Sequence, residues 1–330
     1  MALALAATLL PTAQAAQAAQ PIVIQFSHVV AADTAKGKAA LRFKELAEAR
    51  TGGKVRVEIY PNSQLYKDRE ELDALRLGAV QMLAPSLSKL AGLGGADIEV
   101  FDLPFLFQDH AMFRKVVDGH IGKDLLQRLE HSGIKGLAFW DNGFKVFAAN
   151  RPLQSPADFS GLKMRVQASR VLVRQMQALG SEPSVSPLID VHEALRSGAL
   201  DGEENTPANI YTQNNTALET YLTLSNHGYL GYAVIVNQQF WERLPPTLRS
   251  QLESALRDTT LYENSIAEAE NTRALERIHS EGKLHVYSPD AQEMQQWRSA
   301  LAPVYRAAQA WINPGLISAI QSLGATPVQH

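Results

Sequence analysis

The feature that most constrains the fold is a regular alternation of strand and helix patterns near the beginning of the chain. Short apolar runs are separated by longer segments in which apolar residues recur at helical spacing. The five segments, in order, are strand 22–27, helix 34–50, strand 55–59, helix 67–77 and strand 79–84. This β-α-β-α-β order predicts an α/β fold, in which helices cover both faces of a sheet.

A second series of the same kind begins after residue 143. A helix over 110–131 and a strand over 134–140 precede it, and Asp141-Asn142-Gly143 predicts a turn. The segments after the turn are strand 144–149, strand 162–166, helix 169–179, a short strand before Pro187 and helix 190–197. A chain of 330 residues can bury two cores, so two series predict two lobes.

The last third of the chain contains an apolar strand over 231–237 and an unusually long helix over 246–281. Leu248, Leu252 and Leu256 recur on one face of that helix, which predicts that it packs against the rest of the protein. Two shorter helices, 289–311 and 315–323, follow it.

Composition excludes several classes of function. The chain has 31 basic and 34 acidic residues and a formal charge of −3, so no broad electrostatic field attracts nucleic acid or an anionic membrane. The absence of cysteine rules out disulfides, thiolate zinc sites and cysteine nucleophiles. Any site for an anion must therefore be local.

The first 20 residues, MALALAATLLPTAQAAQAAQ, predict a secretory signal peptide with a cleavage site between Ala13 and Ala19. The positively charged segment that usually begins such a peptide is missing, which leaves open that the signal peptide starts further upstream. An unstructured tail of low complexity is the alternative. No later run reaches the roughly 18 to 20 apolar residues of a membrane helix, so we expect an exported, soluble protein.

Three polar residues, Lys145, Arg165 and Asn205, stand at intervals of 20 and 40 residues. Arg165 lies in GLKMRV, where apolar residues alternate with two cations, as in a half-buried strand. A guanidinium in such a strand offers a rigid fork to a carboxylate. The alternatives are that Arg165 is a surface cation and that Asn205 caps a turn or helix.

Blocks before, around and after these residues resemble one protein family. They are FSHVVAADTAKGKAALRFKELAEARTGGKVRVEIYPNSQLYKDREELDALRLGAVQMLAPS, GLKMRV, ENTPANIY and SNHGYLGYAVIVNQQFWERLP. Together they resemble the dicarboxylate-binding (DctP) branch of the substrate-binding proteins of tripartite ATP-independent periplasmic (TRAP) transporters. The resemblance covers most of the chain.

The resemblance implies a two-lobed periplasmic binding protein fold, with a cleft between the lobes and the long helix spanning both. Lobe I would comprise 21–142 and 231–270, and lobe II 143–230 and 271–330. The ligand would be a small organic acid, a four-carbon dicarboxylate such as succinate, fumarate or malate, delivered to the TRAP membrane subunits. No cofactor is implied.

The resemblance also implies site residues. Arg165 would form the main salt bridge to the ligand carboxylate, and Asn205 would bond to the same group. Lys145 occupies a position where many relatives outside this branch have a second arginine, so it is a further candidate. Asn209, one helical turn after Asn205, and Asn142, at the crossing between lobes, are also expected at the cleft.

Candidates from the first lobe follow from position alone. His28, Lys36 and Ser86 lie at strand ends or in the turns after them, where open α/β sheets present groups to ligands. Each could instead be a solvated loop residue or a cap. The sequence contains no nucleophile elbow, phosphate loop, zinc-binding HExxH or dinucleotide fingerprint, and its nine histidines lack metal-ligand spacing. A cleft enzyme acting on carboxylic acids, a hydrolase or a lyase, is the alternative function.

Overall fold

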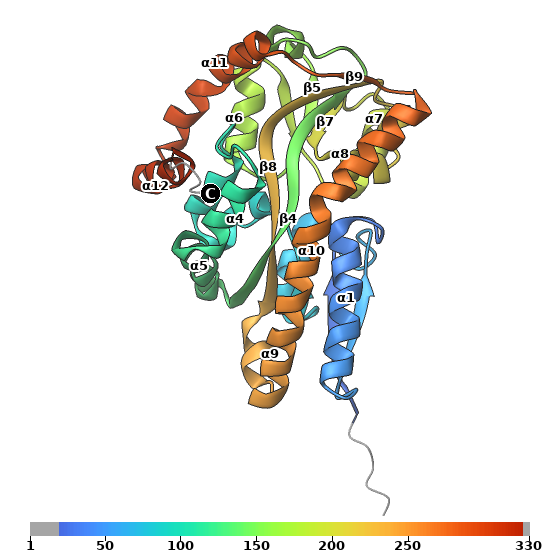
Figure 1. The fold of residues 1–330 in the computed structure, drawn as a ribbon, viewed down its shortest axis with the longest axis vertical. Coiled ribbons are helices and arrows are strands. Elements are labelled where there is room, and N and C mark those ends of the chain that lie inside the picture. The colour runs from blue at the N-terminus through green and yellow to red at the C-terminus, as the bar shows by residue number, and fades with distance from the viewer. Residues whose placement is uncertain (1–19, 326–330) are drawn as a thin grey trace, which may run out of the picture.

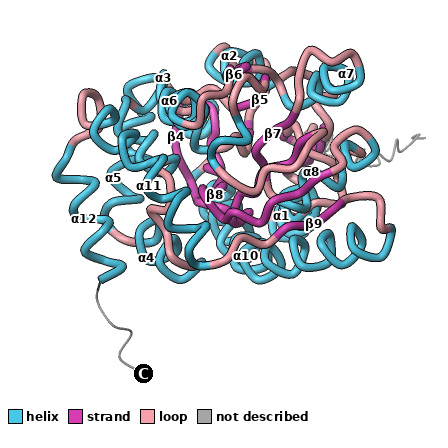
Figure 2. The backbone as a smooth tube through the Cα atoms, turned by 90° about the horizontal axis from the view of Figure 1, so that it is seen from above, coloured by secondary structure: helices cyan, strands magenta, loops and turns pink. Residues whose placement is uncertain are grey.

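The computed structural model describes residues 20–325, and the predicted signal peptide lies outside them except for its last residue. In this part of the chain, nine strands form one continuous sheet in the order β2-β1-β3-β8-β4-β7-β5-β6, with β9 paired to β8. Helices cover the sheet on its outer sides (Figures 1 and 2). The α/β fold predicted from the alternating pattern is confirmed.

The first series forms one end of the sheet. The parallel strands are β1 (Ile22–Ser27), β2 (Val55–Tyr60) and β3 (Met82–Leu83), joined by the helices α1 (Ala35–Arg50) and α2 (Asp68–Arg76). Thr34 caps α1 by accepting a hydrogen bond from the Gly37 amide at 3.2 Å. The last predicted strand, 79–84, is only two residues long in the structure, although Pro85 and Ser86 still pair with β8.

Two long antiparallel strands, β4 (Ile134–Ala149) and β8 (Tyr221–Asn237), run through the whole sheet (Figure 1). The turn predicted at residues 141–143 is wrong, because β4 continues through it with a shift in register between Asp141 and Gly143. Gly143 has φ +130°, and a Cβ there would lie 2.9 Å from Asn271 Nδ2. Glycine therefore gives a bulge in this sequence and bends the strand instead of reversing it.

The second series forms the other end of the sheet. Its strands are β5 (Lys163–Val166), β6 (Glu182–Val185), β7 (Gly202–Asn205) and β9 (His285–Tyr287). β5 is parallel to both β6 and β7, whereas β7 is antiparallel to β4. The helices of this region are α6 (Arg170–Ala178), α7 (Val191–Arg196) and α8 (Pro207–Thr212).

The long helix α10 (Pro246–Glu281) has the predicted bounds. It packs against α1 and β4 along its first part and against α8 further on, and so lies along both ends of the sheet (Figure 1). Leu248, Leu252 and Leu256 are buried in the core between α1, α10 and the sheet. Gly282, in the left-handed conformation, ends the helix.

The remaining helices depart from prediction in one place. The single helix expected over 110–131 is divided into α4 (His110–Asp118), α5 (His120–Gln127) and a 3₁₀ turn, because Gly119 is extended between them. The others are α3 (Ala91–Gly94), α9 (Gln238–Arg243), α11 (Ala291–Ala308) and α12 (Pro314–Ala325). α11 packs on α6, whereas α12 lies against α4. The lobe boundaries stay a prediction.

Gly202 allows β7 to approach β4 closely. A Cβ at this position would lie 2.3 Å from the Ala148 carbonyl oxygen and 2.9 Å from the Ala149 side chain. We expect Gly202→Ala to destabilise the protein by about 1 to 3 kcal/mol, because the backbone must shift to make room. Gly92→Ala is the matched control, since nothing lies within 4 Å of a Cβ there. Urea unfolding that gives both variants the same midpoint would contradict this expectation.

Candidate functional site

A narrow cavity lies between the two ends of the sheet, and the space in it that a water-sized sphere can occupy is only about 10 Å³. Residues from both series line it. Five of the eight predicted site residues are among them: Lys36, Ser86, Arg165, Asn205 and Asn209. The apolar part of the wall is formed by Val29, Val30, Leu188 and Leu230.

Arg165 is a buried cation on the wall of this cavity. Its side chain comes from β5, between β6 and β7, and the residue is only 1% exposed, so it is not a surface cation. Its Nε donates a hydrogen bond to the Ser186 carbonyl at 3.1 Å, whereas Nη1 is buried without a partner in the described structure. A buried charge is costly unless it is paired, so the free edge of the guanidinium is suited to an incoming carboxylate.

Asn205 and Asn209 form a buried amide pair beside it. Asn209 Nδ2 donates to Asn205 Oδ1 at 3.0 Å, and Asn205 Nδ2 in turn donates to Glu203 Oε2 at 3.2 Å. Asn205 ends β7, and Asn209 lies in the first turn of α8, which Pro207 begins. The strand-to-helix junction therefore brings both amides to the same wall of the cavity.

Lys36 is the cation from the first series. Its Nζ donates to the Ala84 carbonyl at 2.9 Å and lies 3.8 Å from the centre of the Tyr232 ring. Burial, followed by repulsion from Lys89, lowers its pKa to about 7. Ser86 donates to Gln167 Oε1 across the cavity and thereby joins the two series.

Three predicted residues do not line the cavity. Lys145 is fully buried and its Nζ lies 2.8 Å from Glu204 Oε2, so it supports the strand that carries Asn205. Asn142 Nδ2 donates to the Tyr232 hydroxyl at 2.6 Å. His28 is buried, and burial together with Lys36 lowers its pKa to about 3, so it is neutral. Sequence position placed these residues near the cleft but did not reveal which neighbour each side chain meets.

Four polar residues of the cavity wall were not predicted: Asp68, Lys89, Gln167 and Tyr232. Gln167 could have been predicted, because it directly follows β5 and stands two residues after Arg165. Alternate residues of a strand share a side, so extending the pattern by one residue places Gln167 on the side of Arg165. Asp68 and Lys89 form an ion pair. Burial alone would raise the pKa of Asp68, but Lys89 and Arg165 outweigh burial and lower it to about 2.

Three further polar contacts join the two series. Lys67 Nζ lies 2.8 Å from Asp190 Oδ1, and the Leu188 amide donates to Asp68 Oδ2 at 2.8 Å. Arg170 Nε lies 3.0 Å from Glu99 Oε2. The first two contacts join the start of α2 to the loop after β6, and the third joins the 3₁₀ helix Ala96–Asp102 to α6.

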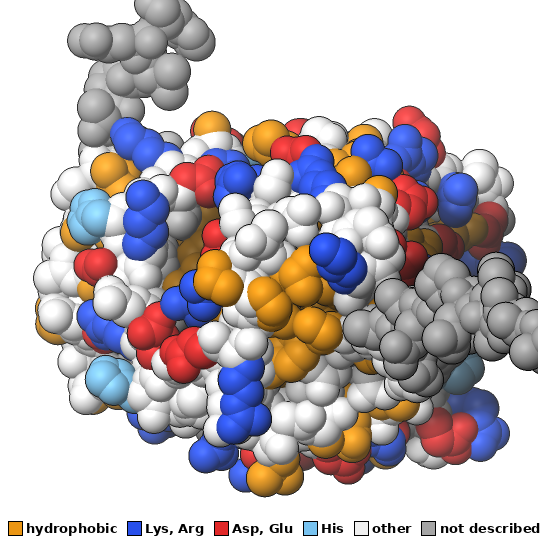
Figure 3. Space-filling view, turned by 90° about the horizontal axis from the view of Figure 1, so that it is seen from below, with side chains coloured by type: hydrophobic (Ala, Val, Ile, Leu, Met, Phe, Trp, Pro, Cys, Tyr) orange, Lys and Arg blue, Asp and Glu red, His pale blue; other side chains and the backbone are white. Residues whose placement is uncertain are grey.

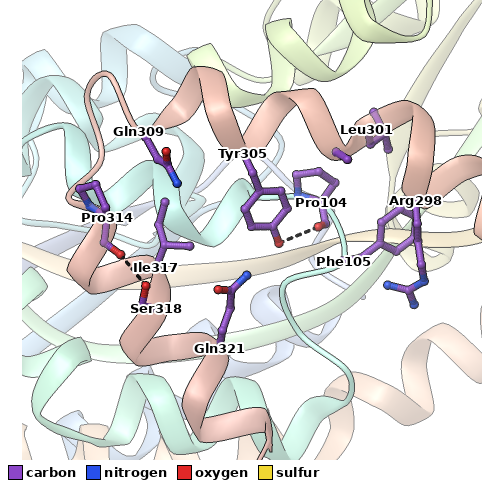
Figure 4. Close-up of a pocket in the computed structure, with 11 residues that line it drawn as sticks. Pro104, Phe105, Arg298, Leu301, Tyr305, Gln309, Pro314, Ile317, Ser318 and Gln321 are labelled. Carbon is purple, nitrogen blue, oxygen red and sulfur yellow. Dashed lines mark hydrogen bonds between the residues drawn. The ribbon is translucent and has the colours of Figure 1, made fainter.

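Other parts of the described surface are less suited to an anionic ligand. A groove between α11 and α12 is lined by Arg298, Tyr305, Ile317 and Gln321 (Figure 4), but Arg298 lies over the ring of Phe105, and Tyr305 bonds to the Pro104 carbonyl. On the face shown in Figure 3, basic and acidic side chains are interspersed. Among residues 20–325, no group of three or more histidine or carboxylate side chains is arranged to hold a metal ion.

Comparison with known proteins identifies the family. The model of the bacterial extracellular solute-binding proteins, family 7 (DctP), matches residues 26–310. The chain belongs to this family. It is 53% identical over 307 residues to the C4-dicarboxylate-binding periplasmic protein DctP of Rhodobacter capsulatus, and the match covers 93% of this chain and 92% of that protein.

Two solved structures of family members are similar over nearly their whole length. A TRAP periplasmic solute-binding protein from Shewanella oneidensis with bound succinate has a TM-score of 0.90 and 39% identity, covering 92% of this chain and 99% of that one. A second, from Pseudomonas aeruginosa with bound L-malate, has a TM-score of 0.85 and 42% identity, covering 87% and 100%. The predicted family and the two-lobed fold are confirmed.

Within the described residues, no helix combines the length and the apolar character that a membrane span requires.

The buried ion pair between Lys145 and Glu204 links β4 to β7. Lys145→Met should destabilise the fold by about 3 to 5 kcal/mol, because Glu204 would be left buried without its cation. The double variant with Glu204→Gln should regain most of that loss, since no unpaired charge remains. Urea unfolding of the two single variants and the double variant measures the coupling. Additive losses would show that the pair does not act as a unit.

Proposed function

We propose that the protein is the solute receptor of a TRAP transporter that captures a four-carbon dicarboxylate such as succinate, fumarate or malate. It works in the periplasm and delivers the acid to the membrane subunits of the transporter. The observation that carries the proposal is the buried Arg165 guanidinium at the cavity wall, whose Nη1 has no hydrogen-bond partner among the described residues. Relatives that bind succinate and L-malate support the choice of ligand.

The net charge of the cavity wall favours the binding of a ligand with two negative charges. Arg165, Lys36 and Lys89 line it together with one carboxylate, Asp68, and this leaves two positive charges when Lys36 is protonated. A ligand with two carboxylates would balance them, whereas a monocarboxylate would leave one buried cation uncompensated. The match between the charge of the wall and the charge of the ligand thus favours dicarboxylates.

In the proposed mode, one carboxylate binds the fork of Arg165 and the amide of Asn205 or Asn209. The other carboxylate meets Lys36 and Ser86, which enter from the first series. Both ends can be held only when the two sides of the cleft are close together, so binding favours the closed arrangement. Binding and release, without any chemical change in the ligand, complete the function. The family consists of solute-binding proteins, and the cleft enzyme considered from sequence has no support.

Arg165 should account for most of the affinity. Arg165→Ala should weaken succinate binding by roughly a hundredfold or more, because the ligand carboxylate loses a desolvated charge partner. Arg165→Lys should also bind poorly, since lysine keeps the charge but lacks the planar fork. Lys163→Ala is the control, because Lys163 lies on the same strand with an exposed side chain. Calorimetry showing wild-type affinity for Arg165→Lys would remove Arg165 from the site.

Binding should be coupled to proton uptake. Lys36 has a pKa lowered to about 7, and Glu71, which is buried and interacts with Lys36, has a pKa raised by burial to about 7. A bound dianion raises both pKa values, because it stabilises the charged lysine and disfavours the charged glutamate. Protons are therefore taken up near neutral pH, and succinate affinity should fall as the pH rises above 7.

Titration calorimetry in two buffers of different ionisation enthalpy measures this uptake directly. Lys36→Met is the comparison, because it removes one of the two titrating groups. A binding enthalpy that is independent of the buffer at pH 7, or proton release, would contradict the coupling.

A further inference from the structure

We propose that the Asp68–Lys89 ion pair is a partition that limits the size of the ligand, and this inference rests on the function proposed above. Two spaces meet at this pair. One is the narrow cavity of about 10 Å³ at Arg165, and the other is a much wider groove of about 560 Å³. Four residues line both spaces: Asp68, Lys89, Arg165 and Gln167. These four residues therefore separate the cavity from the groove.

The Asp68–Lys89 pair is held in place by contacts to both sides of the cleft. Asp68 begins α2, and Lys89 ends the 3₁₀ turn that follows β3. Their side chains are 11% and 8% exposed, so the pair is largely removed from water. Asp68 Oδ2 also accepts a hydrogen bond from the Leu188 amide of the opposite side. Displacing the pair would break a buried ion pair and a buried hydrogen bond together, which makes it a firm boundary.

The groove beyond the wall is suited to the part of a larger acid that the cavity excludes. It is lined by the cation Arg69, by Arg76 with Asp73 at 3.8 Å, and by apolar side chains, including Leu72 and Leu93. With Lys89 shortened, cavity and groove would become one space that begins at Arg165. A dicarboxylate longer than four carbons could then keep one carboxylate at Arg165 and extend into the groove toward Arg69. The excluded ligands are therefore longer dicarboxylic acids.

The test compares succinate with adipate, the six-carbon dicarboxylate, by calorimetry on the full-length mature protein. Lys89→Ala should raise the ratio of adipate affinity to succinate affinity by about tenfold or more, which is the scale of one or two methylene groups in a fitted pocket. Lys89→Met removes the same charge and keeps the bulk, and Arg69→Ala removes a cation from the groove alone. Both should leave the ratio within about threefold of the wild-type value, given that scale.

Asp68→Ala opens the same wall from α2 and should raise the ratio as Lys89→Ala does. An unchanged ratio of adipate to succinate affinity, in either of these two variants that still binds succinate, would overturn the proposal. A rise of the ratio in Lys89→Met as large as that in Lys89→Ala would also overturn it. A crystal structure of the wild-type protein with succinate provides a check that needs no variant. It should show the ion pair intact between ligand and groove, and a ligand passing between Asp68 and Lys89 would overturn the proposal. Failure of the wild-type protein to bind any four-carbon dicarboxylate would instead refute the proposed function.

Discussion

The buried guanidinium of Arg165 is the group on which the rest of the site depends. A charge removed from water must be compensated, and the protein compensates this one only in part. Nε is satisfied by a backbone carbonyl, and Nη1 is left without a partner in the described structure. Asp68 lies near enough that Arg165, after Lys89, lowers the pKa of its carboxyl against the effect of burial. The incomplete compensation is the physical basis of the proposed carboxylate site, because a ligand carboxylate would supply the missing acceptor.

The frame of the molecule explains how groups from distant parts of the chain meet around that cation. β4 and β8 run through the whole sheet, and α10 lies along both of its ends, so the two series are held on one scaffold (Figure 1). The bulge at residues 141–143 bends β4 where the two ends join. Lys145, just beyond the bulge, pairs with Glu204 and thereby braces β7, which presents Asn205. In the described structure Lys145 therefore pairs with Glu204 and does not line the cavity, and its part in ligand binding stays a prediction.

Polarity is distributed unequally between the two sides of the cleft. The second series contributes Arg165, which is always charged, and two amides, whereas the first contributes Lys36, whose pKa is close to neutrality, and the Asp68–Lys89 pair. The second series therefore carries a fixed positive charge, whereas the charge of Lys36 changes with pH near neutrality. The same ion pair also lines the neighbouring groove.

The fold could be predicted from sequence because its elements follow from local patterns. Strand alternation and helical spacing are periodic properties of neighbouring residues, and α10 has the bounds that its pattern predicted. The misplaced turn at 141–143 and the undivided helix over 110–131 were errors of the same local reasoning, since a glycine has several conformations and only its surroundings select one.

Arg165 and Asn205 could be proposed as site residues from the family resemblance and from the strand pattern around Arg165, and the structure brings both to the cavity wall. Which partner each polar side chain meets was decided by tertiary structure alone. Lys145 and Asn142 are turned to Glu204 and Tyr232, while Asp68 and Lys89, 21 residues apart and unremarkable in sequence, meet at the wall. The physical reason is that pairing and burial depend on distances between elements, and those distances are fixed only when the sheet, its bulge and α10 are assembled.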